Sequence, residues 1–242
     1  MMDDHKMLAI IPALNEEHNI GTVVKKIKNT LPGVFVLVIN DGSCDATARQ
    51  ARAHGAEVIN LAYTLGIGAA VQTGLMFARF HGFDIAVQVD GDGQHDPSYI
   101  RRLVEPILKH KADMVIGSRY LEKKGDLSSL QRRIGIRIFS LLISRIMAQP
   151  ITDPTSGFRA MNRRAIELFS DVYPDDYPEP ESLVISHLRR LTVREVPVAM
   201  IRREFGLSSI GGVDAMYYMI KVILAIMIDL CKQGYRARTE EA

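Results

Sequence analysis

Two carboxylates separated by a single glycine, Asp90 and Asp92, are the residues of this sequence best suited to chemistry. They follow an apolar run, residues 85–89, that is typical of a buried strand. In an extended backbone, residues i and i+2 point to the same side, so the two carboxylates can converge on one point. Gln94 adds a neutral oxygen two residues further on. This set of hard oxygen ligands indicates a site for Mg²⁺ or Mn²⁺ that carries the phosphates of a substrate.

The same residues also fit a plainer interpretation. Gly91 and Gly93 allow another group to approach the backbone closely, but an acidic, glycine-rich turn facing water has the same composition. The aspartate pair alone does not separate the two interpretations. A zinc site is not expected, because no cysteine or second histidine lies nearby.

Length and composition limit the class of protein. The chain has 242 residues, of which 47% are hydrophobic and 24% charged, as in a large globular domain. A formal net charge of +2 is too small to predict nucleic acid as a partner. The two cysteines, Cys44 and Cys231, have no metal or redox spacing, which fits a reducing cytosol.

The elements that must position these residues alternate between strand and helix through the first half of the chain. This βαβαβαβ order predicts a parallel sheet with helices on both faces, whose ligands bind at the carboxyl ends of the strands. Asn15 and Glu16 follow the first strand and Asp41 the second, so they should share that edge with Asp90 and Asp92; Asn15 is also the expected N-cap of the first helix. The predicted strands are residues 7–13, 34–40, 57–61 and 85–89, and the helices begin near residues 20, 45 and 66.

Two nucleotide-binding folds are disfavoured by the glycine pattern. Gly66 and Gly68 suggest a dinucleotide fingerprint, but that motif belongs after the first strand, and Gly74 is six residues from Gly68 rather than three. A P-loop is absent from the whole sequence.

Six motifs in this order resemble those of family 2 glycosyltransferases, in particular the dolichol-phosphate mannose synthase and polyprenyl-phosphate glycosyltransferase branch. Single motifs are weak, but their order is specific, and the resemblance covers about residues 10–209. They are I-P-A-L-N-E-E (11–17), V-I-N-D-G-S-C-D-A-T (38–47), G-I-G-A-A-V-Q-T-G-L (66–75), D-G-D-G-Q-H-D-P (90–97), I-G-S-R-Y (116–120) and T-D-P-T-S-G-F-R (152–159).

The resemblance implies a GT-A fold, Rossmann-like with a mainly parallel sheet, that takes a UDP- or GDP-sugar and transfers the sugar with inversion. Asp90 and Asp92 would be the D-x-D pair that holds the metal, with Gln94 as a third contact. Asp41 would face the base or its ribose, where an Asx-turn is the plainer interpretation. The implied nucleotide-sugar site is Pro12, Leu14, Asn15, Glu16, Asp41, Asp90, Gly91, Asp92, Arg119 and Arg203.

The implied acceptor is a polyprenyl phosphate, which is already an anion and needs cations rather than a general base. Arg119 and Arg203 would hold it, with Ser209 at a position where the family often has lysine. A rival acceptor is a hydroxyl of a growing glycan, for which Asp153 would be the general base, with Glu179 and Glu181 as further candidates. Asp92, Asp153 and Arg119 are therefore the candidate catalytic residues.

A third hypothesis is a catalytically silent subunit that binds a sugar nucleotide or a membrane. The intact pair of aspartates disfavours it.

The second half of the chain contains two helical segments that suggest a membrane surface. Residues 131–148 have a wide apolar stripe and four arginines without an acid, which fits a membrane interface, although a core helix with solvated arginines is the commoner case. Residues 215–230 are shorter than the roughly 20 apolar residues of a membrane span. We expect this segment to be interfacial or to join copies of the chain in a homo-oligomer. The predicted organisation is a catalytic domain at 1–210 with a helical appendage at 211–242, peripheral at the cytoplasmic membrane face.

Overall fold

The structure is a computed structural model that describes residues 5–122, 130–175 and 178–201, with side chains for all of these except 130–135. The predicted domain boundary near residue 210 and the segment 215–230 therefore lie outside the described residues.

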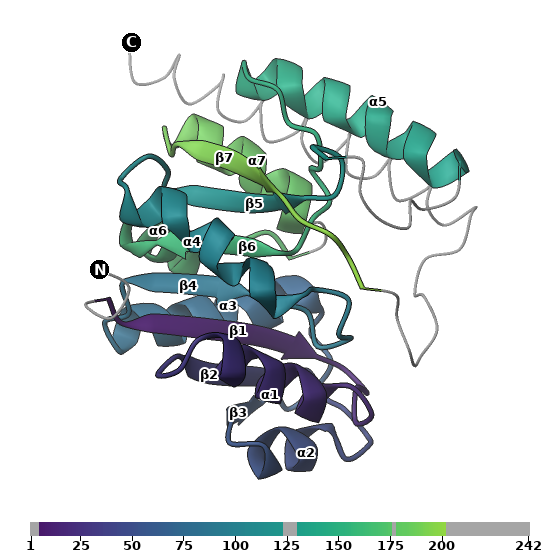
Figure 1. Ribbon diagram of the computed structural model, residues 1–242, viewed down its shortest axis with the longest axis vertical. Helices are drawn as coiled ribbons and strands as arrows, with labels where there is room; N and C mark the ends of the chain where they lie inside the picture. Colours follow the sequence, from purple (N-terminus) through teal and green to yellow (C-terminus); the bar gives the residue numbers. More distant parts are fainter. Residues whose placement is uncertain (1–4, 123–129, 176–177, 202–242) are drawn as a thin grey trace.

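A seven-stranded sheet forms the centre of the molecule, in the order β3-β2-β1-β4-β6-β5-β7 (Figure 1). All neighbouring strands are parallel except that β6 runs antiparallel to both β4 and β5. The prediction of a mainly parallel sheet is confirmed. The strands are β1 (Met7–Ala13), β2 (Phe35–Asn40), β3 (Glu57–Asn60), β4 (Ile85–Gln88), β5 (Met114–Ser118), β6 (Arg159–Asn162) and β7 (Val193–Pro197).

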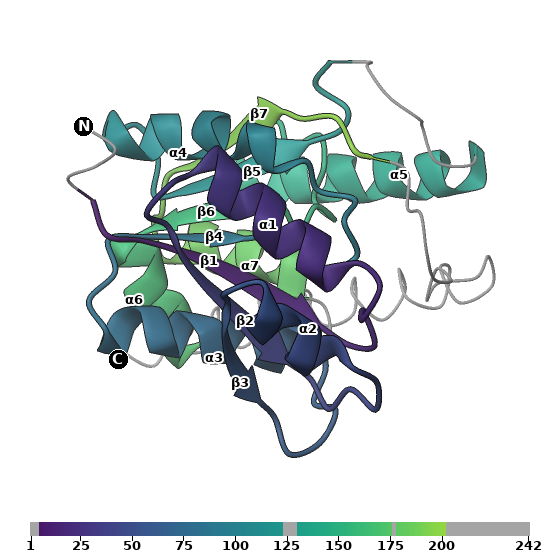
Figure 2. The same ribbon diagram turned by 60° about the horizontal axis from the view of Figure 1, so that its bottom comes forward.

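Helices cover both faces of the sheet, as Figure 2 shows. One face carries α1 (Ile20–Thr30), α2 (Thr47–Ala53) and α4 (Ile100–Leu108), and a short 3₁₀ turn, Pro97–Tyr99, precedes α4. The other face carries α3 (Ile67–Phe80), α6 (Arg163–Asp171) and α7 (Pro178–Leu188). A further helix, α5 (Leu130–Met147), packs against α7 and projects past the carboxyl edge of the sheet in both views.

Successive side chains of each strand point to opposite faces of the sheet, and this produces two hydrophobic cores, one on each face. In β1, Leu8 and Ile10 belong to the core under α3, α5, α6 and α7, whereas Ala9 and Ile11 belong to the core under α1, α2 and α4. Because both faces are covered, β1 is a nearly continuous apolar run, as is usual in parallel sheets.

Helix α5 has a buried apolar side, as expected of a core helix, and an exposed side with apolar and basic residues, as expected of a helix at a membrane interface. Ile136, Phe139, Ile143 and Met147 recur at helical spacing and are buried in the core. On the other side, Ile138 and Leu141 are 56% and 61% exposed, and Arg137 and Arg145 are also exposed. Within residues 5–122, 130–175 and 178–201, no helix has both the length and the apolar content to cross a membrane.

One local prediction needs correction, and one strand was not foreseen. Asn15 is not the N-cap of the first helix, because α1 begins at Ile20 after Asn19, and Asn15 itself has φ 55°, a left-handed turn conformation that asparagine tolerates. The strand β6 was not predicted, because its four residues include an arginine and follow a loop of turn-forming residues.

Candidate functional site

The carboxyl ends of the strands bring the predicted site residues to one edge of the sheet. There the loop after β1 and the loop after β2 are joined by reciprocal hydrogen bonds. Each loop uses side-chain oxygens to accept from backbone N–H groups of the other, so the two loops hold each other in place. The bonds run from Asn15 N to Ser43 Oγ (2.9 Å), from Glu16 N to Thr47 Oγ1 (2.8 Å), from Cys44 N to Asn15 Oδ1 (3.0 Å) and from Ala46 N to Glu17 Oε2 (2.9 Å).

Asp41 lies at this edge and is buried, with 4% of its surface exposed. Its two carboxylate oxygens accept from the backbone N–H groups of Leu65 (2.7 Å) and Gly66 (2.9 Å), just before α3. Gly66 has φ 94°, a conformation that glycine adopts without strain. The carboxylate of Asp41 therefore holds the start of α3 in place. The backbone N–H of Asp41 also donates to the carbonyl of Ala13 (2.9 Å), which joins Asp41 to the end of β1, where the predicted nucleoside-binding residues Pro12 and Leu14 flank Ala13.

Asp90 and Asp92 lie just after β4, with Val89 between the strand and Asp90. The Asp90 side chain is 32% exposed, but its Oδ1 is buried and has no hydrogen-bond partner within the part of the chain that the structure describes. Burial raises the pKa of Asp90 to about 6, although the Gln88 amide and the charges of Arg119 and Arg159 oppose this. Asp92 accepts from the backbone N–H of Gln94 (3.0 Å), which folds the loop back beside the pair.

Gly91, between the two aspartates, allows the loop to approach β1. A Cβ at this position would lie 3.1 Å from the carbonyl oxygen of Pro12, so a larger residue would push the loop away. Residues 90–95, which form the predicted metal loop, are thus held close to β1.

The side-chain oxygens of this loop are suitable ligands for a divalent ion that also binds substrate phosphates. Among the described residues, no three His, Cys, Asp or Glu side chains converge into a complete metal site. Mg²⁺, however, is usually bound through one or two carboxylates together with phosphate oxygens of the substrate. The unpartnered Oδ1 of Asp90 beside Asp92, with Gln94 next to them, suits such an ion.

His95, the residue after Gln94, is buried beneath the predicted metal loop. Its ring is stacked on Phe158, with centroids 4.7 Å apart and an angle of 11° between the planes. Burial lowers the pKa of His95 to about 4 despite the nearby charge of Asp92, so the ring is neutral at physiological pH. His95 was not among the predicted site residues, although it lies inside the D-G-D-G-Q-H-D-P motif.

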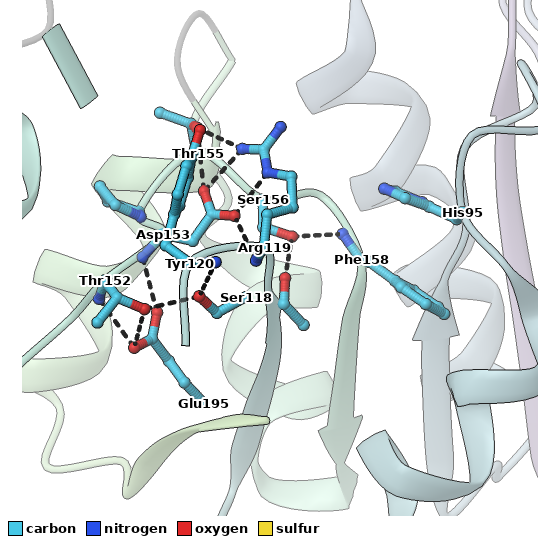
Figure 3. A network of polar contacts seen from close by, with 12 residues as sticks. His95, Ser118, Arg119, Tyr120, Thr152, Asp153, Thr155, Ser156, Phe158 and Glu195 are labelled. Carbon is cyan, nitrogen blue, oxygen red and sulfur yellow. Dashed lines mark hydrogen bonds and ion pairs between the residues drawn. The ribbon is translucent and has the colours of Figure 1, made fainter. Parts of the chain in front are cut away.

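Arg119, directly after β5, makes a two-pronged ion pair with Asp153 (Figure 3). The distances are 2.6 Å from Nε to Oδ2 and 2.7 Å from an Nη atom to Oδ1, and the same Nη atom donates to Thr155 Oγ1 at 2.9 Å. Burial alone would lower the pKa of Arg119, but the hydrogen bond and charge of Asp153 more than offset this and raise it above its usual value. Arg119 is therefore permanently charged and oriented.

This ion pair argues against Asp153 as a general base. Asp153 is fully buried, and both of its oxygens already accept from the guanidinium of Arg119. Proton transfer to either oxygen would break the pair. The geometry assigns Asp153 the task of positioning Arg119.

A second carboxylate fixes the loop that contains Asp153. Glu195 on β7 accepts from Thr152 N (2.8 Å), Thr152 Oγ1 (2.9 Å) and Asp153 N (2.8 Å). The Thr152 hydroxyl also lies 2.6 Å from the Ser118 hydroxyl at the end of β5. The turn-forming composition of residues 152–157 indicates a structured loop, but no sequence pattern connects it with Glu195.

Arg159 on β6 is fully buried and joins the same loop to α7. Its guanidinium donates to the Ser156 carbonyl (2.7 Å), the Glu179 carbonyl (2.7 Å) and the Ser182 hydroxyl (2.5 Å). These bonds hold the first turn of α7, which contains Glu179 and Glu181, close to the carboxyl edge. Burial raises the pKa of Glu179, with the charge of Arg159 opposing it.

The structure thus brings together Asp90, Asp92, Gln94, Arg119 and Asp153, together with His95, Glu195 and Arg159, which the sequence did not single out. The charge of Arg119 is close enough to lower the pKa of Asp90. Arg203 and Ser209 lie outside the described residues.

The chain is similar in sequence to known enzymes. The chain is 30% identical to a polyprenol monophosphomannose synthase from Mycolicibacterium smegmatis over 250 residues, which cover 98% of this chain and 90% of that protein. It is also 30% identical to a UDP-N-acetylglucosamine--dolichyl-phosphate N-acetylglucosaminyltransferase from Methanococcus voltae over 252 residues, 94% of this chain and 100% of that protein.

Solved structures support the fold. The crystal structure of glucosyl-3-phosphoglycerate synthase from Mycobacterium tuberculosis in complex with Mn²⁺, UDP-glucose and phosphoglyceric acid superposes with a TM-score of 0.71. The match covers 95% of this chain and 81% of that one at 22% identity. The predicted GT-A fold is confirmed.

The sequence also matches a protein family as a whole. Residues 8–169, which are more than half of the chain and nearly all of the region from β1 to α6, match Glycosyl transferase family 2. The chain belongs to this family and is a glycosyltransferase.

Proposed function

We propose that this protein transfers a sugar, with inversion, from a UDP- or GDP-sugar to the phosphate of a polyprenyl or dolichyl lipid. The two relatives described above are named for polyprenol monophosphomannose synthesis and for transfer to dolichyl phosphate, and each match spans nearly the whole of both chains. The structural feature that best supports this acceptor class is the ion pair between Asp153 and Arg119. An acceptor phosphate is already ionised, so it needs no carboxylate base at the position where Asp153 is held in an ion pair.

The donor would lie along the carboxyl edge between the β1 and β2 loops and the metal loop. Pro12, Leu14, Asn15, Glu16 and Asp41 would form the nucleoside pocket, and Asp90, Asp92 and Gln94 would hold Mg²⁺ or Mn²⁺ against the diphosphate. When bound, the ion supplies positive charge that offsets the charge developing on the leaving diphosphate. Gly91 keeps the loop close to β1.

Arg119 would supply the fixed cation on the acceptor side of the site. Asp153 holds its guanidinium from one side, and Glu195 holds the loop that carries Asp153. A preorganised charge of this kind stabilises a transition state without reorganising during the reaction. Arg203 and Ser209 would add further contacts to the acceptor phosphate.

The lipid acceptor requires the protein to work at a membrane surface. Ile138 and Leu141 are exposed on α5 beside Arg137 and Arg145, and this helix projects past the edge that carries the site (Figure 1). We infer that α5 lies in the interface at the cytoplasmic face of a membrane, with its arginines toward anionic lipid.

A transfer assay tests the proposal directly. The purified full chain is incubated with Mn²⁺ and labelled UDP- or GDP-sugars, with undecaprenyl phosphate, undecaprenol or a soluble oligosaccharide as the acceptor. We expect label to enter organic solvent only with the lipid phosphate, and the product anomer to be opposite to that of the donor. Asp92→Asn is the inactive control.

Two results would contradict the proposal. Label on the soluble oligosaccharide would indicate a hydroxyl acceptor, with Glu179, whose pKa is raised, as the next candidate base. Failure to release nucleotide from any donor with any acceptor would indicate a silent binding subunit.

A further inference from the structure

We propose that His95 is a positioning residue, whose ring fixes both the backbone and the carboxylate of Asp90 in the orientation that a metal ion requires. This inference rests on the proposed function, because that function gives Asp90 its task.

Both nitrogens of the His95 ring face the same residue. Nδ1 lies 3.0 Å from the backbone nitrogen of Asp90, and Nε2 lies 3.5 Å from Asp90 Oδ2. The backbone N–H can only donate, so Nδ1 must accept and carries no proton. The ring proton is then on Nε2, on the side of the carboxylate. At 3.5 Å this N–H attracts the carboxylate electrostatically but is too far for a good hydrogen bond.

The ring itself is held from several directions. Phe158, which is fully buried, stacks on one face of the imidazole. The backbone of His95 pairs with Met200 in an antiparallel bridge, and Ile201 N donates to the Gln94 carbonyl at 2.8 Å. His95 itself is only 3% exposed. A ring restrained in this way has one orientation, and it can transmit that orientation to Asp90.

Gly157 bounds Asp90 on another side. A Cβ there would lie 3.2 Å from Asp90 Oδ1 and 3.1 Å from Gln88 Nε2. The carboxylate therefore has His95 near Oδ2 and the Gly157 backbone near Oδ1. Oδ1 is buried, whereas the side chain as a whole is 32% exposed, so the restraint fixes the carboxylate while leaving its exposed side open to a cation.

Such restraint matters because Asp90 leads into a loop with glycines at 91 and 93, whose ordering would otherwise oppose metal binding. Groups that orient metal ligands typically contribute 10–100-fold to metal affinity. His95 would act in this way through the preorganised geometry of Asp90, without touching substrate or metal.

Direct Mn²⁺ binding tests the inference without any catalytic readout. Free Mn²⁺ is counted by electron paramagnetic resonance during titration of the full chain with Mn²⁺ alone. We expect His95→Phe, which keeps an aromatic ring on Phe158 but removes both nitrogens, to bind Mn²⁺ about 10–100-fold more weakly. His95→Asn, whose amide oxygen can take the place of Nδ1, should recover part of the loss. Phe83→Leu, a buried aromatic change at the opposite end of β4, should leave Mn²⁺ binding unchanged.

A second measurement needs no metal. The ring ¹⁵N shifts of His95 in the metal-free protein should show an unprotonated Nδ1 and a protonated Nε2. A proton on Nδ1 would overturn the inference, as would wild-type Mn²⁺ affinity in His95→Phe. Pulsed resonance that detects a nitrogen bound to Mn²⁺ would make His95 a ligand and would also overturn it.

A parallel titration of Asp92→Asn separates this inference from the proposed function. If Asp92→Asn binds Mn²⁺ as wild type does, the metal site itself is wrong and both proposals fail. If Asp92→Asn binds weakly and His95→Phe binds normally, only the positioning role of His95 fails.

Discussion

At the scale of residues, the charged groups of the site differ in how far their neighbours constrain them. Arg119 and Asp153 neutralise each other through two hydrogen bonds, while the Oδ1 of Asp90 lacks a hydrogen-bond partner among the described residues. A buried carboxylate oxygen without a hydrogen-bond partner lowers the stability of the folded protein, unless a bound group such as a metal ion interacts with it. The contrast supports metal binding at Asp90 and a fixed guanidinium at Arg119.

Asp92→Asn should abolish transfer while leaving the fold intact. A neutral amide is a weaker ligand for a hard cation, and Asp92 lies in a loop after β4 rather than in either core. The measurement is sugar transfer as a function of Mn²⁺ concentration, with circular dichroism as the control for folding. Wild-type activity in the variant, or in the wild type with EDTA, would contradict the metal assignment.

Asp153→Asn should both destabilise the protein and reduce transfer. Breaking a buried ion pair from one side costs about 3–5 kcal/mol, and we expect the lower end because the Arg119 side chain is 21% exposed. Urea denaturation gives the change in the free energy of unfolding.

The double variant Arg119→Met/Asp153→Leu separates charge pairing from catalysis. Replacing both partners by apolar groups is often close to neutral for stability. The double variant should therefore recover much of the lost stability while remaining inactive. Substantial transfer by this variant would remove Arg119 from the mechanism.

The sequence predicted individual site residues well only where a local motif contains them. Asp90, Asp92 and Arg119 follow strand ends, so their common edge could be expected from strand order alone. The ion pair between Arg119 and Asp153, 34 positions apart, and the bonds from Glu195 to Thr152 and Asp153 depend on tertiary placement. For that reason Asp153 appeared from sequence to be an available base.

At the scale of elements, Arg159 shows why β6 was missed. A buried arginine is untypical of a strand, and here it is tolerated because carbonyl and hydroxyl oxygens of the neighbouring loop and of α7 surround its guanidinium. Local composition indicates a loop, whereas pairing with β4 and β5 makes these four residues a strand.

Arg159→Lys should therefore destabilise the protein, although the charge is kept. A lysine cannot reach acceptors on two segments at once, and each buried carbonyl left unpaired costs about 1–3 kcal/mol. Arg163→Lys is the matched control on the next element, because the hydrogen bonds of Arg163 with Asp84 and Gly82 are exposed. Equal free energies of unfolding for the two variants would contradict this account.

Helix α5 should attach the protein to anionic membranes. Changing Arg137 and Arg145 to glutamine removes two charges worth about 1 kcal/mol each near an anionic surface, so binding should weaken roughly 30-fold. Ile138→Ser/Leu141→Ser should weaken it as well, by removing the apolar contact. Sedimentation with vesicles that contain phosphatidylglycerol measures the bound fraction.

The control for α5 is Phe80→Ser on α3, which changes an apolar side chain that is 86% exposed but far from the site edge. It should sediment as wild type does. Identical sedimentation of all variants would show that α5 does not bind the membrane and has only a structural role.

At the scale of the whole molecule, the predicted donor site spans several elements from both sides of β1. A ligand that binds only the native state raises its stability, by about 2.7 kcal/mol at a concentration 100 times the dissociation constant. For a chain of this size we expect the midpoint of thermal unfolding to rise by roughly 5–10 °C. A screen of UDP- and GDP-sugars with and without Mn²⁺ should find one nucleotide that does this only with the ion.

Asp90→Asn is the control for that screen, and the shift should disappear in it. A shift of the same size without Mn²⁺ would argue against an ion bridging the donor and the metal loop.

The position of β6 also sets an order of events during synthesis. β4 and β5 leave the ribosome well before β6, yet β6 is the strand that lies between them. Until residue 162 emerges, the facing edges of β4 and β5 lack their final partner, and exposed strand edges promote pairing with other chains. The nascent chain therefore passes through a stage at which the part of the sheet from β3 to β4 can pair, while β5 has no partner strand to join it to that part. A chaperone that shields strand edges would be most useful to this protein at that stage.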